Sequence, residues 1–359
     1  MVYGLELGKI REKLCERGEL KETSKKNPPL IEDTMRAAHF QNNQIRLQTQ
    51  DRPVPGAGEA LIRVDMAGIC GTDLEILAGY AQFTGIPGHE FVGHVLQAKD
   101  QPDLIGQRVV ADINIGCKTC SWCLQGNHRH CQKRQVIGIR DRDGAFAHYL
   151  CCPLPNLIPV PPDLDNKQAV MAEPLAAALE VSQQVHLTAQ TRVAVLGDGK
   201  LGLLCALALR HFAPDLHLIG RHASKLQVAQ AQGVATYHLQ GPDQDTIPGA
   251  QNFDCVVDCT GRADGLDTAL KLVRPEGIVV LKTTSHQPTT LDMSLVVVKE
   301  VTLLGSRCGD MHLALHFLDM GWVDVLPLID SVFPLTHLHE ALNRAAQSGA
   351  LKVLVDCRE

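Results

Sequence analysis

The fold class is decided by one run of sequence, Arg192-Val-Ala-Val-Leu-Gly197-Asp-Gly199-Lys200-Leu201-Gly202. Its apolar first half predicts a buried strand, and the residues from Leu201 to His211 predict a helix. Gly197 permits a tight turn, Gly199 lets the backbone approach a pyrophosphate, and Gly202 lets the helix pack closely on the strand. Because a helix N-terminus attracts phosphate, we interpret the run as a dinucleotide-binding fingerprint rather than an ordinary strand–helix turn. Its candidate cofactor-binding residues are Gly197, Gly199, Lys200, Leu201 and Gly202.

Strands and helices alternate on the C-terminal side of this run. Further strands are expected at Leu216–Gly220, Phe253–Asp258 and Gly277–Lys282. Helices are expected between them at Ser224–Gln232 and Gly265–Val273. The alternation predicts an α/β fold with a doubly wound parallel sheet over residues 163–305.

The rest of the chain has a different pattern. Residues 35–162 contain short strand-forming runs separated by turn residues, which predict a β-rich domain. Residues 306–359 end in the strand-like run Leu351–Asp356, and we expect them to return to that domain and complete it. Residues 1–34 mix acidic and basic side chains and are expected to be an N-terminal extension with no part in the chemistry.

The end of the second expected strand bears on the choice of cofactor. A site that prefers NAD usually carries Asp or Glu there, and the run Ile219–Lys225 has no acidic residue. Arg221 can pair with a 2′-phosphate or stack on adenine, and His222 and Lys225 lie beside it. A solvated basic helix start would look similar, but the missing acid favours NADP over NAD.

Four cysteines follow one another at spacings that are typical of a metal site. Cys117, Cys120, Cys123 and Cys131 can bring four thiolates around one tetrahedral ion, as in a closed structural zinc site. The Gly126–Asn127 step gives the chain a turn before the fourth cysteine. A disulfide pair is the alternative, and His128 or His130 could replace one of the thiol ligands.

A second metal set is dispersed over three motifs. Cys70 follows an expected strand and has the Thr72 hydroxyl two residues later, and His89 stands beside Glu90. With Glu173 these residues form a Cys/His/Glu set that leaves one position for water or substrate. Glu173 also suits the first turn of a helix, where an acid interacts favourably with the helix dipole.

Taken together, the motifs resemble the zinc-dependent medium-chain dehydrogenase/reductase family over residues 35–359. The resemblance rests on five runs in order: Gly68–Asp73, Gly88–Gly93, Cys117–Cys131, Ala172–Leu175 and Gly197–Gly202. It implies a GroES-like catalytic domain made of both chain ends, with a Rossmann NAD(P)-binding domain inserted between them. It also implies a catalytic zinc bound by Cys70 and His89, in addition to the structural zinc. At the position of Glu173 many alcohol dehydrogenases have cysteine. A glutamate there makes this chain similar to the sorbitol, threonine and glucose dehydrogenase branch.

The resemblance further implies reversible oxidation of an alcohol to a carbonyl, with hydride passing to the nicotinamide. Thr72 is then placed to take the alcohol proton, and Glu90 to modulate exchange of the zinc ligands. Asp73 is expected to orient one of the metal ligands without itself binding the metal. Several relatives carry histidine three residues after the threonine, whereas this chain has Glu75, so either Glu75 or water receives the proton.

The composition of the chain indicates which kinds of partner and which cellular compartment to expect. The net charge of −6 and the pI of about 6.2 do not favour a nucleic acid or an anionic membrane as partner. No apolar stretch is long enough to span a bilayer. The 13 cysteines are odd in number and several lie in apolar runs, which suits a reducing cytoplasm.

The sequence leaves the substrate open. Tyr80 and Phe83 could line the pocket or be ordinary core residues, and a glutamate ligand suggests a polyol, a sugar or a hydroxy-amino acid. The alternatives to an alcohol dehydrogenase are an NADPH-dependent carbonyl reductase, a zinc-free enone reductase and a non-catalytic zinc-stabilised nucleotide-binding protein. The segment Met293–Leu304 is a plausible exposed edge strand of the sheet, which predicts a homodimer or homotetramer.

Overall fold

The computed structural model describes residues 32–79, 82–239, 247, 251–283 and 290–358. The expected extension 1–34 therefore lies outside the described residues except for its last three positions, and so does Tyr80. Asp33–Glu359 form one compact unit. No helix in its described part is long and apolar enough to cross a membrane.

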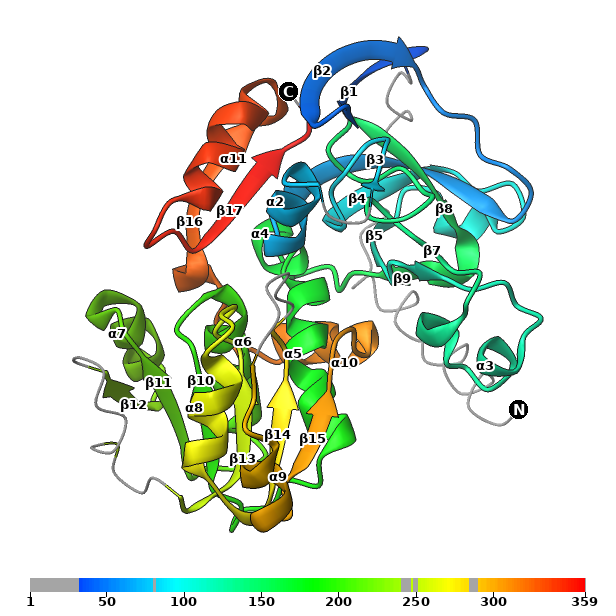
Figure 1. Ribbon diagram of the computed structural model, residues 1–359. Coiled ribbons are helices and arrows are strands. Elements are labelled where there is room, and N and C mark those ends of the chain that lie inside the picture. Colours follow the sequence, from blue (N-terminus) through cyan, green and yellow to red (C-terminus); the bar gives the residue numbers. More distant parts are fainter. Residues whose placement is uncertain (1–31, 80–81, 240–246, 248–250, 284–289, 359) are drawn as a thin grey trace, which may run out of the picture. The chain divides into compact units, whose positions relative to one another are not determined.

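Half of the unit is built on a six-stranded parallel sheet with strand order β12-β11-β10-β13-β14-β15 (Figure 1). The strands are β10 (Val193–Leu196), β11 (Leu216–Gly220), β12 (Ala235–His238), β13 (Phe253–Asp258), β14 (Val273–Leu281) and β15 (Thr302–Gly305). The direction of winding reverses at β10, which lies between β11 and β13. Ligands of such sheets bind at the carboxyl ends of the strands beside this reversal.

Helices cover both faces of this sheet, as the alternating burial of β10 shows. Val193 and Val195 pack in the cluster that contains α5, α6, α7 and α10, whereas Ala194 and Leu196 pack in the cluster that contains α8 and α9. The helices are α5 (Ala172–Gln184), α6 (Lys200–Leu209), α7 (Ala223–Ala231), α8 (Gly265–Leu272), α9 (Met293–Val298) and α10 (Met311–Asp319). The predicted doubly wound α/β fold is confirmed.

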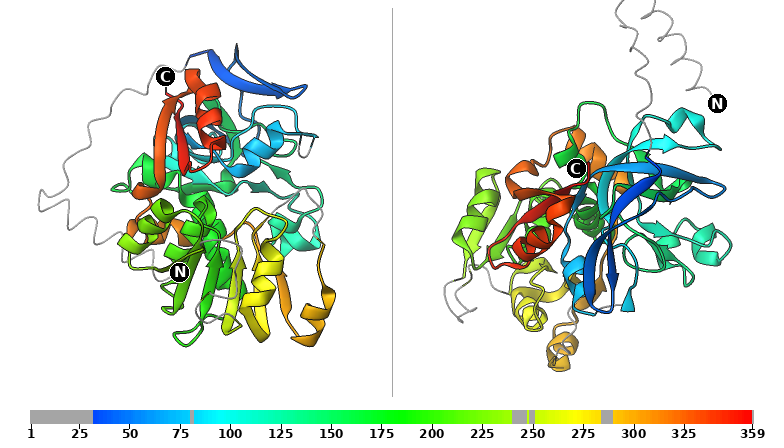
Figure 2. Two further views of the ribbon diagram at one scale, coloured as in Figure 1. Left: turned by 60° about the vertical axis from the view of Figure 1, so that its left-hand side comes forward. Right: turned by 90° about the horizontal axis from the view of Figure 1, so that it is seen from above.

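The other half contains a seven-stranded sheet with order β16-β17-β3-β4-β5-β9, in which β8 also pairs with β3. Its strands are β3 (Glu59–Gly68), β4 (Glu90–Gln97), β5 (Arg108–Ala111), β8 (Tyr149–Pro153), β9 (Leu157–Pro159), β16 (Ile329–Pro334) and β17 (Lys352–Asp356). The C-terminal β17 pairs antiparallel with β3, Leu354 opposite Gly68. Figure 2 shows the red C-terminal strands beside the blue-to-cyan strands from the beginning of the unit.

Smaller elements surround this second sheet. The remaining strands are β1 (Thr34–Gln41), β2 (Gln44–Asp51), β6 (Asn114–Ile115) and β7 (Gln135–Val136). The remaining helices are α2 (Gly71–Leu77), α3 (Ser121–Leu124), α4 (Asn166–Ala169) and α11 (Leu338–Ala346). The short 3-10 helices are η2 (Pro102–Leu104), η3 (His128–His130), η4 (Leu154–Asn156), η6 (Leu326–Leu328) and η7 (Leu335–His337).

The expected edge strand is shorter than its sequence suggested. Asp292 caps a helix here, because its side chain accepts a hydrogen bond from the Ser294 amide at 2.9 Å. The apolar run that follows therefore forms α9, and only Thr302–Gly305 forms the edge strand β15. Val297 and Val298 of α9 are 71% and 81% exposed.

Candidate active site and metal centres

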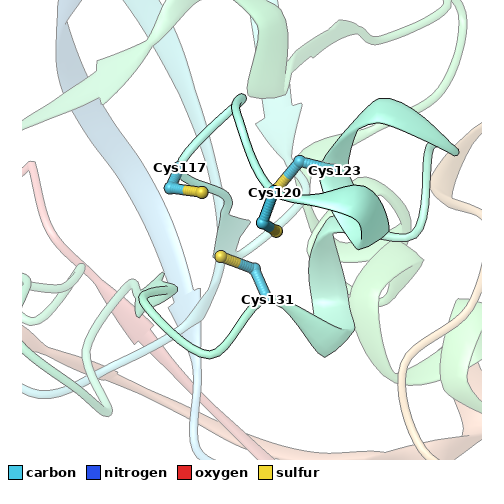
Figure 3. A group of neighbouring side chains, drawn as sticks. All are labelled: Cys117, Cys120, Cys123 and Cys131. Atoms are coloured by element: carbon cyan, nitrogen blue, oxygen red, sulfur yellow. The ribbon is translucent and has the colours of Figure 1, made fainter.

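The four predicted zinc cysteines converge at one point. The sulfur atoms of Cys117, Cys120, Cys123 and Cys131 all lie within 4.8 Å of one another, and Figure 3 shows them turned toward a common space. Gly126 has a φ of +79°, which lets the chain turn back toward Cys131. None of the four forms a disulfide in the described part of the chain. Four thiols around one point are a donor set that fits a tetrahedral zinc ion.

The histidines of this lobe have other partners. His128 pairs through Nε2 with the Asp112 carboxylate at 2.8 Å, and that hydrogen bond raises the pKa of His128. His130 lies with its ring centroid 5.4 Å from that of Trp122. Arg129 fixes the lobe to the rest of the unit, since its guanidinium contacts Glu180 at 2.7 Å and the Cys308 carbonyl at 2.7 Å. The sequence offered no signal for this last role.

A second group is formed by Cys70, His89 and Glu90, whose possible ligand atoms lie within 4.8 Å of one another. Cys70 precedes α2 and Glu90 begins β4, and the pairing of β3 with β4 brings them together. The Thr72 hydroxyl lies 3.8 Å from the Cys70 sulfur. Glu90, rather than the predicted Glu173, is the carboxylate closest to this compact group, and the role of Glu173 stays a prediction.

Asp73 fixes the positions of Cys70 and His89 by contacting both residues. One carboxylate oxygen accepts a hydrogen bond from the Cys70 amide at 2.8 Å, and the other lies 3.1 Å from His89 Nδ1. With Nδ1 engaged, His89 can offer the lone pair of Nε2, which is the usual arrangement of a histidine metal ligand. Burial opposes the charged imidazole, but Asp73 and Cys70 hold the pKa of His89 well above its ordinary value. A thiol and an oriented imidazole fit a zinc ion.

Lys352 is a member of the site that sequence reasoning missed. Its ammonium contacts the two oxygens of Glu90 at 2.7 and 2.5 Å, and both side chains are almost completely buried. A Cβ on Gly68 would lie 2.3 Å from a Glu90 oxygen, so the glycine of the first motif leaves room for this carboxylate. The available signal was a single lysine inside the apolar run Leu351–Val355.

Glu173 lies in the first turn of α5 and is half-buried. It is not part of the compact Cys70 group, but its charge interacts with those of His89, Glu90 and Lys352. Burial raises the pKa of this carboxyl to about 7. The position suits a carboxylate that faces the group and acts directly or through a water.

The glycine fingerprint joins β10 to α6, with Gly199 as the N-cap. No heavy atom lies within 4 Å of the position of a Cβ on Gly199, so this face is open to a ligand. A Cβ on Gly202 would lie 1.8 Å from the Gly197 carbonyl oxygen, which explains the third glycine. Lys200 is half-buried next to it, and its charge interacts with those of Lys352, Cys70 and Glu90. Leu201 packs against the core on the α5 side.

The tip of β11 does carry a carboxylate, although the local sequence has none. Asp198 of the fingerprint accepts hydrogen bonds from the amides of Arg221 and His222 at 2.7 and 2.6 Å. The His222 ring also contacts it at 2.9 Å. The run Ile219–Lys225 itself has no acid, as the sequence indicated, but the neighbouring loop brings one to this tip. Arg221 is exposed beside it, and Lys225 is buried in the first turn of α7.

Two further residues singled out in the sequence, Glu75 and Phe83, lie outside the groups described above. Glu75 lies on α2, three residues after Thr72, and is half-buried. Phe83 is 7% exposed and belongs to the buried core.

Comparison with known proteins agrees with this geometry. The family model of the alcohol dehydrogenase GroES-like domain matches residues 56–162, and that of the glucose dehydrogenase C-terminus matches residues 167–356. The chain belongs to the zinc-type medium-chain alcohol dehydrogenase family. The predicted family, fold and enzyme class are thus confirmed, and so is the use of zinc with NAD(P). Neither a dedicated carbonyl reductase nor a non-catalytic protein is favoured.

Several members of this dehydrogenase family are similar over most of the chain. An erythritol/L-threitol dehydrogenase of Mycolicibacterium smegmatis is 29% identical, covering 85% of this chain and 92% of its own. An L-galactonate-5-dehydrogenase of Escherichia coli is 30% identical over 74% of this chain and 81% of its own. A structure of a zinc-binding dehydrogenase from Sinorhizobium meliloti with NADP has a TM-score of 0.82 at 28% identity, covering 90% and 100% of the two chains. The Escherichia coli protein RspB, determined with NADH, has a TM-score of 0.84 at 26% identity, with the same coverage.

Proposed function

We propose that this dehydrogenase oxidises a secondary hydroxyl of a small polyhydroxylated substrate at the Cys70–His89 centre. The observation that carries the proposal is that the buried Asp73 contacts both Cys70 and His89, at a site whose charges also act on Lys200 of the glycine fingerprint. Zinc at this centre supplies Lewis acidity to a hydroxyl, and the nicotinamide supplies the hydride acceptor.

Each residue of the chain has a separate task in this proposal. Cys70 and His89 bind the metal, Glu173 completes its surroundings directly or through water, and Asp73 fixes the imidazole. Thr72 accepts the proton of the substrate hydroxyl, because its own hydroxyl lies beside the Cys70 sulfur. Glu75 or water then receives that proton. Glu90, neutralised by Lys352, modulates exchange at the metal.

The names of the relatives support a polyol or a sugar acid as the substrate. Erythritol, threitol and L-galactonate are open-chain compounds with several adjacent hydroxyls. For the cofactor, the exposed Arg221 supports NADP, whereas the carboxylate of Asp198 at the same strand tip supports NAD. Relatives with either cofactor form are known, so both enter the test.

Oligomeric state and location also belong to the proposal. The edge strand β15 and the exposed apolar side chains of α9 support a homodimer or homotetramer that covers this edge. The many free cysteines support a reducing cytoplasm.

The test combines metal analysis with turnover. We expect two zinc ions per chain and reduction of NAD or NADP by members of a panel of tetritols, hexitols, aldonates and hydroxy-amino acids. Glu173→Ala should abolish turnover while the four-cysteine zinc stays bound, and the exposed Glu340→Ala serves as the matched control. Full turnover by Cys70→Ser or by Glu173→Ala would refute the proposed centre.

A further inference from the structure

A group of cationic side chains gathers where the four-cysteine lobe meets the loop after β15. Arg134 follows the fourth cysteine, and Arg307 lies two residues beyond the end of β15. The Arg307 guanidinium donates a hydrogen bond to the Arg129 carbonyl, which brings the two segments together. The charges of Arg307 and Arg140 act on Arg134, and those of Arg129, Arg307 and Arg134 act on His130.

Among the described residues, two of these cations lack an acidic partner. Arg129 is neutralised by Glu180, and Arg140 lies 3.5 Å from Asp141. In the described part of the chain, no carboxylate pairs with Arg134 or Arg307. Arg134 donates to the Cys131 carbonyl at 3.3 Å, and its buried Nε has no hydrogen-bond partner. Guanidinium groups held together without a carboxylate repel one another, and an anion that bridges them removes that repulsion.

The loop that carries Arg307 is fixed to α5, the helix whose first turn carries Glu173. Lys282 donates to the carbonyls of Ala177 at 2.5 Å and of Arg307 at 3.0 Å. Ala177 is four residues after Glu173, which is about 6 Å along a helix axis. The thiol of Cys308, next to Arg307, interacts with the charge of Glu173.

From this arrangement we infer that Arg134 and Arg307 bind an anionic group, a phosphate or a carboxylate, at the far end of the substrate. The inference rests on the proposed function and replaces neutral polyols by polyol phosphates or sugar acids as its preferred substrates. Planar guanidinium groups recognise both anions through paired N–H donors, so the two are separated by experiment. Arg134 and Arg307 are specificity residues in this scheme and do not touch the reacting carbon.

Kinetics test the inference with three matched substrates: the best neutral polyol, its terminal phosphate ester and its terminal carboxylate. We expect one of the two anions to have the highest kcat/KM, and the identity of that anion names the group. Arg134→Gln and Arg307→Gln should raise KM for that anion roughly ten- to hundred-fold, with little change in kcat or in neutral-polyol turnover. Arg134→Lys should retain part of the effect, and Lys133→Gln, which removes an exposed charge next to Arg134, should have none.

Direct binding of inorganic phosphate gives an independent readout. Calorimetry on the full zinc-loaded chain should detect phosphate binding that Arg134→Gln removes, while zinc content reports that the lobe is still folded. If neutral polyols are turned over best and phosphate does not bind, the inference is overturned although the dehydrogenase function stands. If no substrate is turned over, the proposed function fails, and phosphate binding alone decides whether the cluster is an anion site.

Discussion

The buried ion pair between Glu90 and Lys352 gives a prediction whose size follows from the structure. Lys352→Met removes the ammonium but keeps a side chain of similar length, and it leaves the fully buried Glu90 carboxylate without its cation. Removing one partner of a buried pair costs about 3–5 kcal/mol, because the remaining charge stays in a poorly solvated place. We expect a loss of this size in the free energy of unfolding.

Urea unfolding of the zinc-loaded protein measures this loss. The double variant Lys352→Met/Glu90→Gln should lose less than the single variant Lys352→Met, since no charge is then left buried. Lys271→Met removes the ammonium of an exposed pair with Asp267, and it should cost below about 0.5 kcal/mol. A loss below about 1 kcal/mol for Lys352→Met, or a double variant less stable than it, would refute the reasoning.

The pH dependence of the same difference has a defined sign. Burial lowers the pKa of Lys352, but the charge of Glu90 outweighs burial and raises it above its ordinary value. A raised pKa on a basic group stabilises the folded state fully below the unfolded pKa of about 10.4, and the effect is lost as pH rises through the folded pKa. The difference between wild type and Lys352→Met should therefore be constant near neutral pH and shrink only in strong alkali.

Three further predictions concern the metals and the cofactor. Because burial raises the pKa of Glu173 to about 7, the zinc affinity of the catalytic centre should rise as pH increases through that value. Chelator competition should show the rise in wild type and a weaker one in Glu173→Gln. Asp198→Asn removes the carboxylate from the tip of β11, so the NADP-to-NAD ratio of kcat/KM should increase about tenfold; an unchanged ratio contradicts this role. Cys131→Ser removes a fully buried thiol of the lobe, which should reduce bound zinc from two ions to one and lower the melting temperature. If the Cys131→Ser variant still bound two zinc ions and had an unchanged melting temperature, the lobe would not be a zinc site.

Most of the fold could be predicted because its signals are local. The apolar runs and the glycine spacing around Gly197 fix a strand, a turn and a helix within a few residues, and the observed α6 and β11 lie within one or two residues of the expected bounds. The four cysteines are equally local, since 15 residues contain all of them. Local spacing alone was sufficient there to indicate which side chains would meet.

The parts that could not be predicted depend on contacts between distant segments. Lys352 meets Glu90 across 262 residues, through the pairing of β17 with β3 and of β3 with β4. Arg129 meets Cys308 across 179 residues. Asp198 is close in sequence, but its side chain crosses to the next strand, so a search of the β11 tip alone finds no acid. In α9, the Asp292 cap outweighed the strand propensity of the valines.

The charges around the catalytic centre argue for a cation there, independently of any motif. Burial alone would lower the pKa of His89 and raise that of Glu173, so the two groups should respond in opposite directions. Instead both are raised, because the negative groups Asp73 and Cys70 outweigh burial at His89. The negative groups around His89 therefore favour a positive charge at this point of the centre. A divalent cation bound there would supply that charge, interact with the same negative groups and leave His89 neutral, as a ligand must be.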